Sequence, residues 1–219
     1  MQSQCESMGS MPKQVDHRER RTLIAEALMR VAAEHGLEAV SLRHVAAEAG
    51  VTSGMVQHYF RTKDEMMAFA LAVVRERNEA RVTAAVGQLG DSSPRALLRT
   101  MLVELLPLDE PRRVDGRVAL AFLAYTAVRP AAAAALRDDT AGMLMFVADQ
   151  IRAAQATGQA HAQIDPVEAA VGLLAVMEGL GVHLLGGHYA PDTALNALDA
   201  HLDMIFDSSG ESAGQGRVS

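Results

Sequence analysis

The chain has 219 residues, which predicts one large domain or two unequal ones, and its 49% hydrophobic and 21% charged residues exclude a wholly disordered polymer. Aromatic residues make up only 4% of the chain and Trp is absent, so an all-β fold is disfavoured and helices are expected. The formal net charge of −7 argues against a protein that holds a polyanion over its whole surface.

Both ends of the chain are polar and aperiodic. We expect residues 1–12 and 208–219 to be disordered tails. The single cysteine, Cys5, cannot form a disulfide within the chain, so nothing points to an oxidising compartment. Residues 1–22 contain no apolar core of signal-peptide length, and a cytoplasmic protein is expected.

Between these ends, apolar residues recur at helical spacing in almost every window, and no alternating strand pattern of useful length occurs. The protein is therefore predicted to be all-α. Asp16 and Glu19 form a capping-box pattern that predicts the start of the first helix, and Gly36 ends it. The predicted buried stripe of this helix consists of Leu23, Ile24, Ala27, Leu28 and Val31.

Two short helices follow. The first of them starts after Ser41 as N-cap and stops at Gly50, where glycine supplies a left-handed turn. The next starts at Thr52 or Ser53 and runs to about Tyr59. The residues predicted to face inward are Leu42, Val45, Ala46, Val56 and Phe60.

The rest of the chain predicts six longer helices. Thr62 and Glu65 form a capping box, Asp165 and Pro166 form a strong start signal, and Leu108 to Arg112 is predicted as a loop. The expected ranges are Lys63 to Gln88, Pro94 to Leu106, Arg113 to Val128, Ala131 to Ala156, Pro166 to Gly186, and after Pro191 to about Phe206.

The most hydrophobic stretch is Val167 to Leu185. It is interrupted by Glu168 and Glu178, so we predict a buried helix and no membrane insertion. Small residues at spacings of three and four share one face of this helix and favour a homodimer interface, with packing inside the chain as the competing explanation. These residues are Gly172, Ala175 and Gly179.

The segment from Ser41 to Phe60 has the pattern of a helix-turn-helix, in which the second helix enters the DNA major groove. By spacing alone, a purely structural helical corner is the alternative. Small residues at the start of that helix, Thr52 to Gly54, let the backbone approach a phosphate. The side chains able to reach base edges are Met55, Gln57 and His58, and Arg43 suits a guanine or a phosphate.

Charge is distributed unevenly along the chain. Residues 11–63 carry eight Lys or Arg against six Asp or Glu, a net charge of +2, whereas residues 64–219 carry −8. The basic character needed to bind DNA is therefore confined to the region that contains the helix-turn-helix pattern.

The segment from Arg18 to Met67 resembles the N-terminal DNA-binding domain of TetR-family transcriptional regulators. Gly50 to Gly54, His58 to Phe60 and Lys63 to Glu65 carry the resemblance. It implies a dimeric regulator, in most members a repressor, with a helical C-terminal domain that binds a small molecule and forms the dimer. We accordingly expect a helix-turn-helix domain at 13–62 and a larger helical bundle at 63–207.

The resemblance also implies roles for single residues. Arg43 would reach into the groove, and Tyr59 and Lys63 would touch phosphates. Gln57 occupies a position where many members have Tyr, so a base contact is expected there instead. The full predicted DNA-binding set is Ser41, Arg43, Thr52, Ser53, Gly54, Met55, Gln57, His58, Tyr59 and Lys63.

The C-terminal half is similar to the subgroup that contains the choline-responsive regulator of glycine-betaine synthesis, through residues 158–166 and 175–180. That likeness concerns the scaffold and names no ligand. A mostly apolar pocket is predicted, with Tyr125 as its polar group and ordinary core packing as the alternative for each residue. Its candidate residues are Met101, Leu105, Phe122, Tyr125, Met143, Phe146, Met177 and His183.

Neither a metal site nor a cofactor nor catalysis is expected. The histidines His161, His183, His188 and His201 fall on separate predicted elements or at their ends, without zinc spacing. No recognisable group of nucleophile, base and orienting residue occurs. The predicted function is a homodimeric repressor released from an inverted-repeat operator in double-stranded DNA by a small molecule. The alternative is a helix-turn-helix regulator that responds to a protein partner and has no small-molecule pocket.

Overall fold

The computed structural model describes residues 12–36, 40–127 and 129–206. Within these ranges it contains nine α-helices, and the β-type pairing found there is an isolated bridge between Ala160 and Phe206. The prediction of an all-α protein is confirmed. Residues 208–219 and Cys5 lie outside the described residues, as does the predicted N-terminal tail except for Pro12, which begins the first helix.

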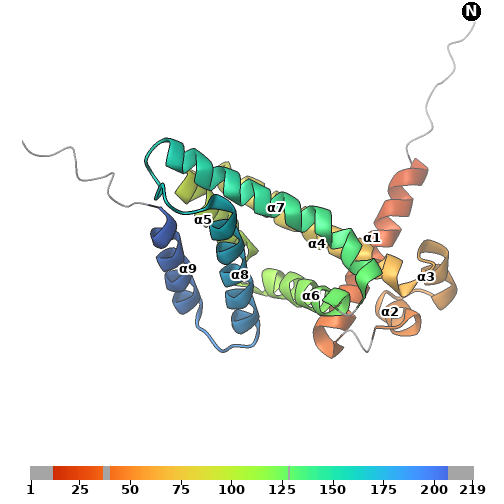
Figure 1. Ribbon diagram of the computed structural model, residues 1–219. Helices are drawn as coiled ribbons and strands as arrows, with labels where there is room; N and C mark the ends of the chain where they lie inside the picture. Colours follow the sequence, from red (N-terminus) through yellow and green to blue (C-terminus); the bar gives the residue numbers. More distant parts are fainter. Residues whose placement is uncertain (1–11, 37–39, 128, 207–219) are drawn as a thin grey trace, which may run out of the picture. The chain divides into compact units, whose positions relative to one another are not determined.

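The chain divides into two compact units, and the division falls between Val73 and Val74, inside the fourth helix. In the first unit, the opening helix packs against the two short helices that follow it, and these pack against each other (Figure 1). The helices of this unit are α1 (Pro12–His35), α2 (Leu42–Glu48), α3 (Ser53–Tyr59) and the start of α4 (Lys63–Val86).

Local signals define the two short helices. The Ser41 hydroxyl accepts a hydrogen bond from the backbone N–H of His44 at 3.2 Å, and the Thr52 hydroxyl accepts one from Met55 at 3.2 Å. Gly50 has a φ of +67°, which lets the chain turn between α2 and α3 at no steric cost. The predicted ends of both helices are confirmed.

The start of α1 and one face of it differ from the prediction. Asp16 lies inside α1, because the helix already begins at Pro12, and proline is itself favoured at the first helical position. Leu23 was predicted to be buried but is 39% exposed, since Ala25 and Met29 are buried and shift the packed face away from it. Leu42 is only half-buried.

A stacked arginine ties the start of α4 to α1. The Arg21 guanidinium carbon lies 4.7 Å from the ring centroid of Phe60 and 4.5 Å from that of Phe69. Its Nη2 also donates to Glu65 at 3.2 Å. The other oxygen of Glu65 accepts from the backbone N–H of Arg61 at 3.0 Å, so one carboxylate joins α1 to the connection between α3 and α4.

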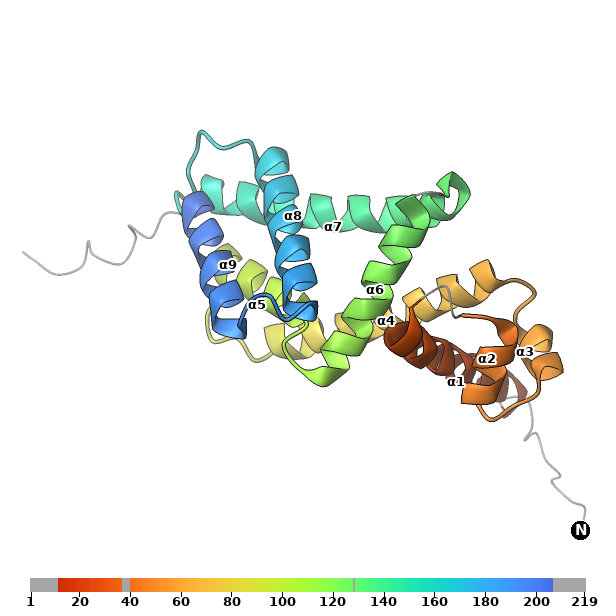
Figure 2. The same cartoon turned by 90° about the horizontal axis from the view of Figure 1, so that it is seen from below.

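The second unit contains the rest of α4 and five further helices. The longest helix of this unit packs along the helix that follows it and also contacts the two that precede it, and the last two helices run side by side (Figures 1 and 2). The helices are α5 (Pro94–Leu105), α6 (Glu110–Ala127), α7 (Pro130–Ala156), α8 (Pro166–Leu185) and α9 (Pro191–Ile205). Its core includes Leu98, Leu102, Leu106, Val147, Ile151, Leu173, Leu184, Leu198 and Leu202.

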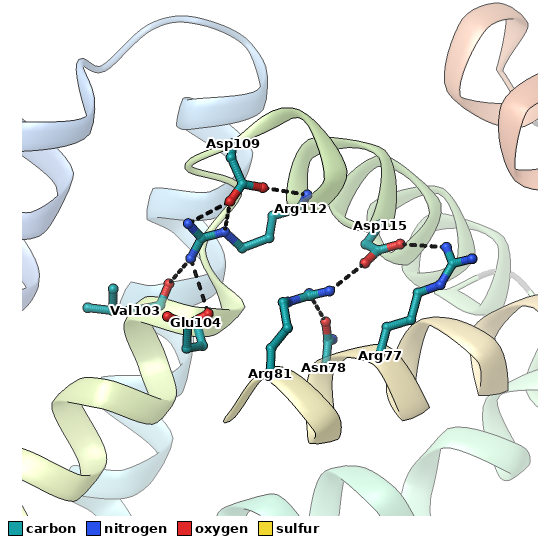
Figure 3. Close-up of polar contacts among 8 residues, drawn as sticks. All are labelled: Arg77, Asn78, Arg81, Val103, Glu104, Asp109, Arg112 and Asp115. Atoms are coloured by element: carbon teal, nitrogen blue, oxygen red, sulfur yellow. Dashed lines mark hydrogen bonds and ion pairs between the residues drawn. The ribbon is translucent and has the colours of Figure 1, made fainter. Parts of the chain in front are cut away.

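The start of α6 corrects the predicted loop at Leu108 to Arg112. The helix begins at Glu110, because the Asp109 carboxylate accepts from the backbone N–H of Arg112 at 2.9 Å and from its Nε at 2.8 Å (Figure 3). Pro111 is tolerated in the first turn, where no helical partner for its nitrogen exists. The backbone hydrogen bond from Arg112, with its side chain second, lowers the pKa of Asp109.

A buried carboxylate joins α6 to the second half of α4. Asp115 is 4% exposed and accepts from Arg81 at 2.9 Å and from Arg77 at 3.4 Å (Figure 3). Arg81 also contacts the side-chain oxygen of Asn78. One charge is thus shared by two arginines that lie one turn apart on α4.

A partly buried and an exposed ion pair join α5 to α9. Arg99 donates to both oxygens of Asp199, at 2.6 and 2.9 Å, and Arg95 lies 2.5 Å from Asp203. The side-chain hydrogen bonds from Arg99, more than its charge, lower the pKa of Asp199 below its ordinary value. The bidentate pair therefore favours the ionised carboxylate in the folded chain.

We predict that Asp199→Asn lowers the free energy of unfolding at pH 7 by about 0.5–1 kcal/mol, as expected of a partly exposed pair. Because folding depresses this pKa, the contribution is complete above the unfolded value of 3.8 and is lost as the pH falls through the lower folded value. Urea denaturation of both proteins should give a constant difference from pH 7 to 5 and a smaller one below pH 4. Asp149→Asn is the control, because it breaks an exposed ion pair with Arg152 inside α7 and leaves the pair of Arg99 and Asp199 in place. A difference that shrinks between pH 7 and 5 would contradict the assignment.

Candidate DNA-binding site

The outer face of α3 is open to solvent. Val56 is the residue of this helix that is buried, and it anchors α3 on the first unit. The large side chain of Met55 is 39% exposed. The other exposed residues of the helix are Ser53, Gly54, Gln57 and His58. A polar helix face that contributes nothing to the core is available to contact a groove of DNA.

The capping hydroxyls of Ser41 and Thr52 are exposed as well as bonded within the chain. Arg43 is exposed on the first turn of α2, and Lys63 is half-buried at the first position of α4. The starts of α2 and α3, with the predicted DNA-binding residues Ser41, Arg43 and Thr52, therefore lie in the same unit.

A row of rings flanks α3. Tyr59 is half-buried, and its ring centroid lies 4.9 Å from that of His17 on α1 and 5.2 Å from that of His58. Sequence reasoning missed His17, because only the folded arrangement of α1 against α3 places it beside Tyr59. A separate contact between α1 and α2 is an ion pair, in which Nε of Arg30 lies 2.5 Å from a carboxylate oxygen of Glu48.

Gly54 has no structural reason to be glycine. A Cβ built there would meet nothing closer than the Thr52 hydroxyl at 3.9 Å, and the residue does not have a positive φ. Glycine costs about 0.5–1 kcal/mol relative to alanine in a helix interior, and in the first turn, where Gly54 lies, it still does not favour the helix. A residue that weakens the helix without relieving any internal contact is consistent with close approach by a partner outside the chain.

Among the predicted pocket residues, Phe122 and Tyr125 make a ring contact. Met101 and Phe122 are buried, and Phe122 lies beside Tyr125 with ring centroids 6.3 Å apart. The Arg129 guanidinium carbon sits 3.9 Å from the centroid of the Tyr125 ring. Leu105 is half-buried.

The remaining candidates belong to α7 and α8. Met143 and Phe146 are 36% and 42% exposed on α7, Met177 is half-buried against the core, and His183 is exposed near the end of α8. Phe122 and Tyr125 are thus the predicted pocket residues that make a ring contact with each other.

The helix α8 is not buried as a whole, contrary to the prediction. By length and composition alone, α8 could cross a membrane. Only 22% of its most apolar window is buried, whereas the sequence predicts a buried helix. Its packed face holds Ala170, Leu173, Leu180 and Leu184, whereas Val171 and Val182 are 52% and 42% exposed. Apolar residues occur all around this helix, so the sequence pattern alone does not show which face is left exposed within one chain.

The small residues of α8 lie on its exposed side. Gly172, Ala175 and Gly179 are all exposed, and a Cβ built at Gly172 or Gly179 would meet nothing within 4 Å. The competing explanation, that these glycines allow close packing inside the chain, is therefore not supported. For comparison, a Cβ at Gly116 would contact Leu185 at 3.5 Å.

Two family models match the chain. Residues 24–69 match the model for bacterial regulatory proteins of the tetR family, and residues 94–207, more than half of the chain, match the C-terminal domain of BetI-type transcriptional repressors. The chain belongs to the TetR family of transcriptional regulators. Both matched domains of this TetR-family protein are those of helix-turn-helix regulators, so it is not an enzyme.

Similar proteins agree with this. The HTH-type transcriptional regulator PksA of Bacillus subtilis is 41% identical over 115 residues, which cover 52% of this chain and 55% of PksA, about half of that relative. The crystal structure of a transcriptional regulator from Rhodococcus sp. RHA1 is 36% identical, covers 84% of this chain and 95% of its own, and has a TM-score of 0.73. A regulator from Saccharomonospora viridis in complex with choline shares the fold, with 23% identity, coverage of 87% and 99%, and a TM-score of 0.77.

We predict that Gly54→Ala does not lower the stability of the protein and yet weakens its binding to DNA at least fivefold, because the added methyl group lies between α3 and the groove. Thermal melting and fluorescence anisotropy, with a duplex selected by the protein from random DNA, measure the two effects. Gly142→Ala is the matched control, since it lies exposed on α7 with nothing within 4 Å of its Cβ position. Unchanged DNA affinity in Gly54→Ala would refute the close approach.

Proposed function

We propose that this TetR-family regulator is a homodimeric repressor in the cytoplasm, which binds an inverted-repeat operator and leaves it when a small molecule binds the C-terminal domain. The observation that carries the proposal is the exposed face of α3, whose buried residue is Val56, within the segment 11–63 that has a net charge of +2. A two-fold dimer presents two such helices, so half-sites about one DNA turn apart are expected.

The exposed side chains of α3 fit base recognition. Gln57 has an amide suited to paired hydrogen bonds with adenine, and Met55 offers an apolar contact to a thymine methyl group. Arg43 is exposed on α2, which supports a contact to guanine or a phosphate. Backbone N–H groups at Ser53 and Gly54 suit a phosphate, and we assign further phosphate contacts to Tyr59 and Lys63.

The uncovered face of α8 supports the homodimer. Val171 and Val182 expose apolar surface there, and Gly172, Ala175 and Gly179 permit a second helix to approach closely. A second copy of the same helix, related by a two-fold axis, presents the same surface and covers both at once.

The effector is proposed as a small molecule held by the second unit near Phe122 and Tyr125. Choline is bound in the Saccharomonospora viridis protein. In the present chain the Tyr125 ring already carries the guanidinium of Arg129 at 3.9 Å, so a quaternary ammonium compound has to displace that cation to stack there. Whatever its identity, an effector shifts DNA binding only through its different affinity for the bound and released states.

Substitutions in the first unit test the mode of DNA binding. If Arg43 contacts a base, Arg43→Ala should weaken the free energy of binding to the selected operator by about 1–3 kcal/mol and should change binding to random DNA little. Lys63→Ala should weaken binding to both kinds of DNA alike and flatten the dependence of log K on log salt by about one contact. Anisotropy titrations between 50 and 200 mM salt give both quantities. Failure of the wild-type chain to select any sequence from random DNA would refute the function itself.

Replacement of a small residue on α8 tests the dimer. Ala175→Glu buries a charge in the proposed interface, so sedimentation equilibrium should show a monomer, and operator affinity should fall more than tenfold because one half-site is lost. Ala119→Glu, at an exposed alanine on α6, should leave both unchanged. If Ala175→Glu sediments as the wild type does, α8 is not the interface.

A further inference from the structure

The end of α8 brings two histidines together. His188 donates its backbone N–H to the carbonyl of His183 at 2.9 Å, Gly187 donates to Leu184 at 3.1 Å, and Gly187 has a φ of +69°. This pair of hydrogen bonds around a left-handed glycine is a Schellman motif, which makes the side chains at these two positions neighbours. Hydrophobic residues often occupy them, but here both are imidazoles.

The two rings are hydrogen-bonded to each other through their Nδ1 atoms, which are 3.2 Å apart. A metal ion bound by both Nδ1 atoms would replace this hydrogen bond, with each neutral ring then carrying its proton on Nε2. Gly186 makes room for this, because a Cβ there would lie 2.9 Å from Cε1 of His188. On the other side, the ring centroid of Tyr189 lies 4.5 Å from that of His183. Backbone geometry, an absent side chain and a neighbouring ring therefore all hold the imidazoles in place.

The separation of the nitrogens suits a metal ion. Two nitrogen ligands at about 2.0–2.1 Å from one tetrahedral zinc ion are about 3.3 Å apart, close to the spacing already present. Imidazole binds zinc, copper and nickel well. Both histidines are exposed, so water can occupy the remaining ligand positions. No group of three or more His, Cys, Asp or Glu side chains suited to a metal gathers in the described ranges.

The surroundings limit the affinity. The carbonyl end of a helix attracts cations. However, the Arg113 guanidinium already donates to the carbonyls of Leu184 and Leu185, at 3.1 and 3.2 Å, and its charge opposes a second cation. Two ligands and this repulsion point to weak, reversible binding.

We propose that His183 and His188 form a two-histidine site for a divalent transition-metal ion at the C-terminal end of α8. The two ligands come from the helix and from the connection to α9, so a bound ion links these two elements. The site could not be predicted from the sequence, because the two histidines are five residues apart and do not match the spacing expected for zinc.

Ni²⁺ binding to the full chain, without an affinity tag and with Cys5→Ser to remove the thiol, tests the proposal by isothermal titration calorimetry. We expect one Ni²⁺ per chain and a loss of at least tenfold in affinity in His183→Ala and in His188→Ala. His201→Ala is the control, because its ring is bonded to the Ala197 carbonyl on α9 at 2.9 Å and should not affect the site. Ni²⁺ should also raise the melting temperature of the wild type and of His201→Ala only.

A variant that keeps both imidazoles tests the geometry. Gly187→Ala strains the left-handed turn and should weaken Ni²⁺ binding severalfold, provided that circular dichroism shows an unchanged helix content. Binding that is undiminished in either single histidine variant, or absent from the wild type at 1 mM Ni²⁺, would overturn the proposal. Either result leaves the assignment of DNA binding unaffected, since that assignment uses the first unit.

Discussion

The carboxylate of Asp115 is the contact on which the arrangement of the second unit around α4 depends. Burial of a lone carboxylate is costly, and contacts with two guanidinium groups compensate this cost. Arg81 and Arg77 are 27% and 38% exposed, so they neutralise Asp115 while remaining partly hydrated. Removal of both arginine side chains would leave a buried charge without these partners. Helix α6 also carries Phe122 and Tyr125, so any rearrangement around those rings acts on a helix that is electrostatically tied to α4.

The two units use their surfaces in opposite ways. In the first unit, the contacts of Arg21 and Glu65 hold the start of α4 against α1. The seven-residue helix α3 buries Val56 and exposes most of its other residues to solvent. In the second, α8 buries one face and leaves an apolar face with small residues uncovered. A polar exposed face suits a hydrated, charged partner such as DNA, whereas an apolar one suits another protein surface.

Features set by neighbours in sequence were predictable, and those set by neighbours in space were not. Ser41, Gly50 and Thr52 act within a few residues, so the helix-turn-helix and its ends followed directly from the sequence. The start of α6 was missed because Pro111 suggested a break, although proline is acceptable in a first turn that Asp109 caps. Leu23 and the outer face of α8 were misassigned because periodicity reports that a helix is apolar, not which neighbour covers it. The contact between His183 and His188 depends on a backbone turn that composition does not reveal.

The boundary between the two units falls inside α4, and this has a consequence for any attempt to produce one unit alone. A cut between Val73 and Val74 would break the helical hydrogen bonds that span this point of α4. Each fragment would then carry a new helix end with backbone groups that lack their helical partners. A fragment meant to retain the first unit should therefore extend to the end of α4 at Val86.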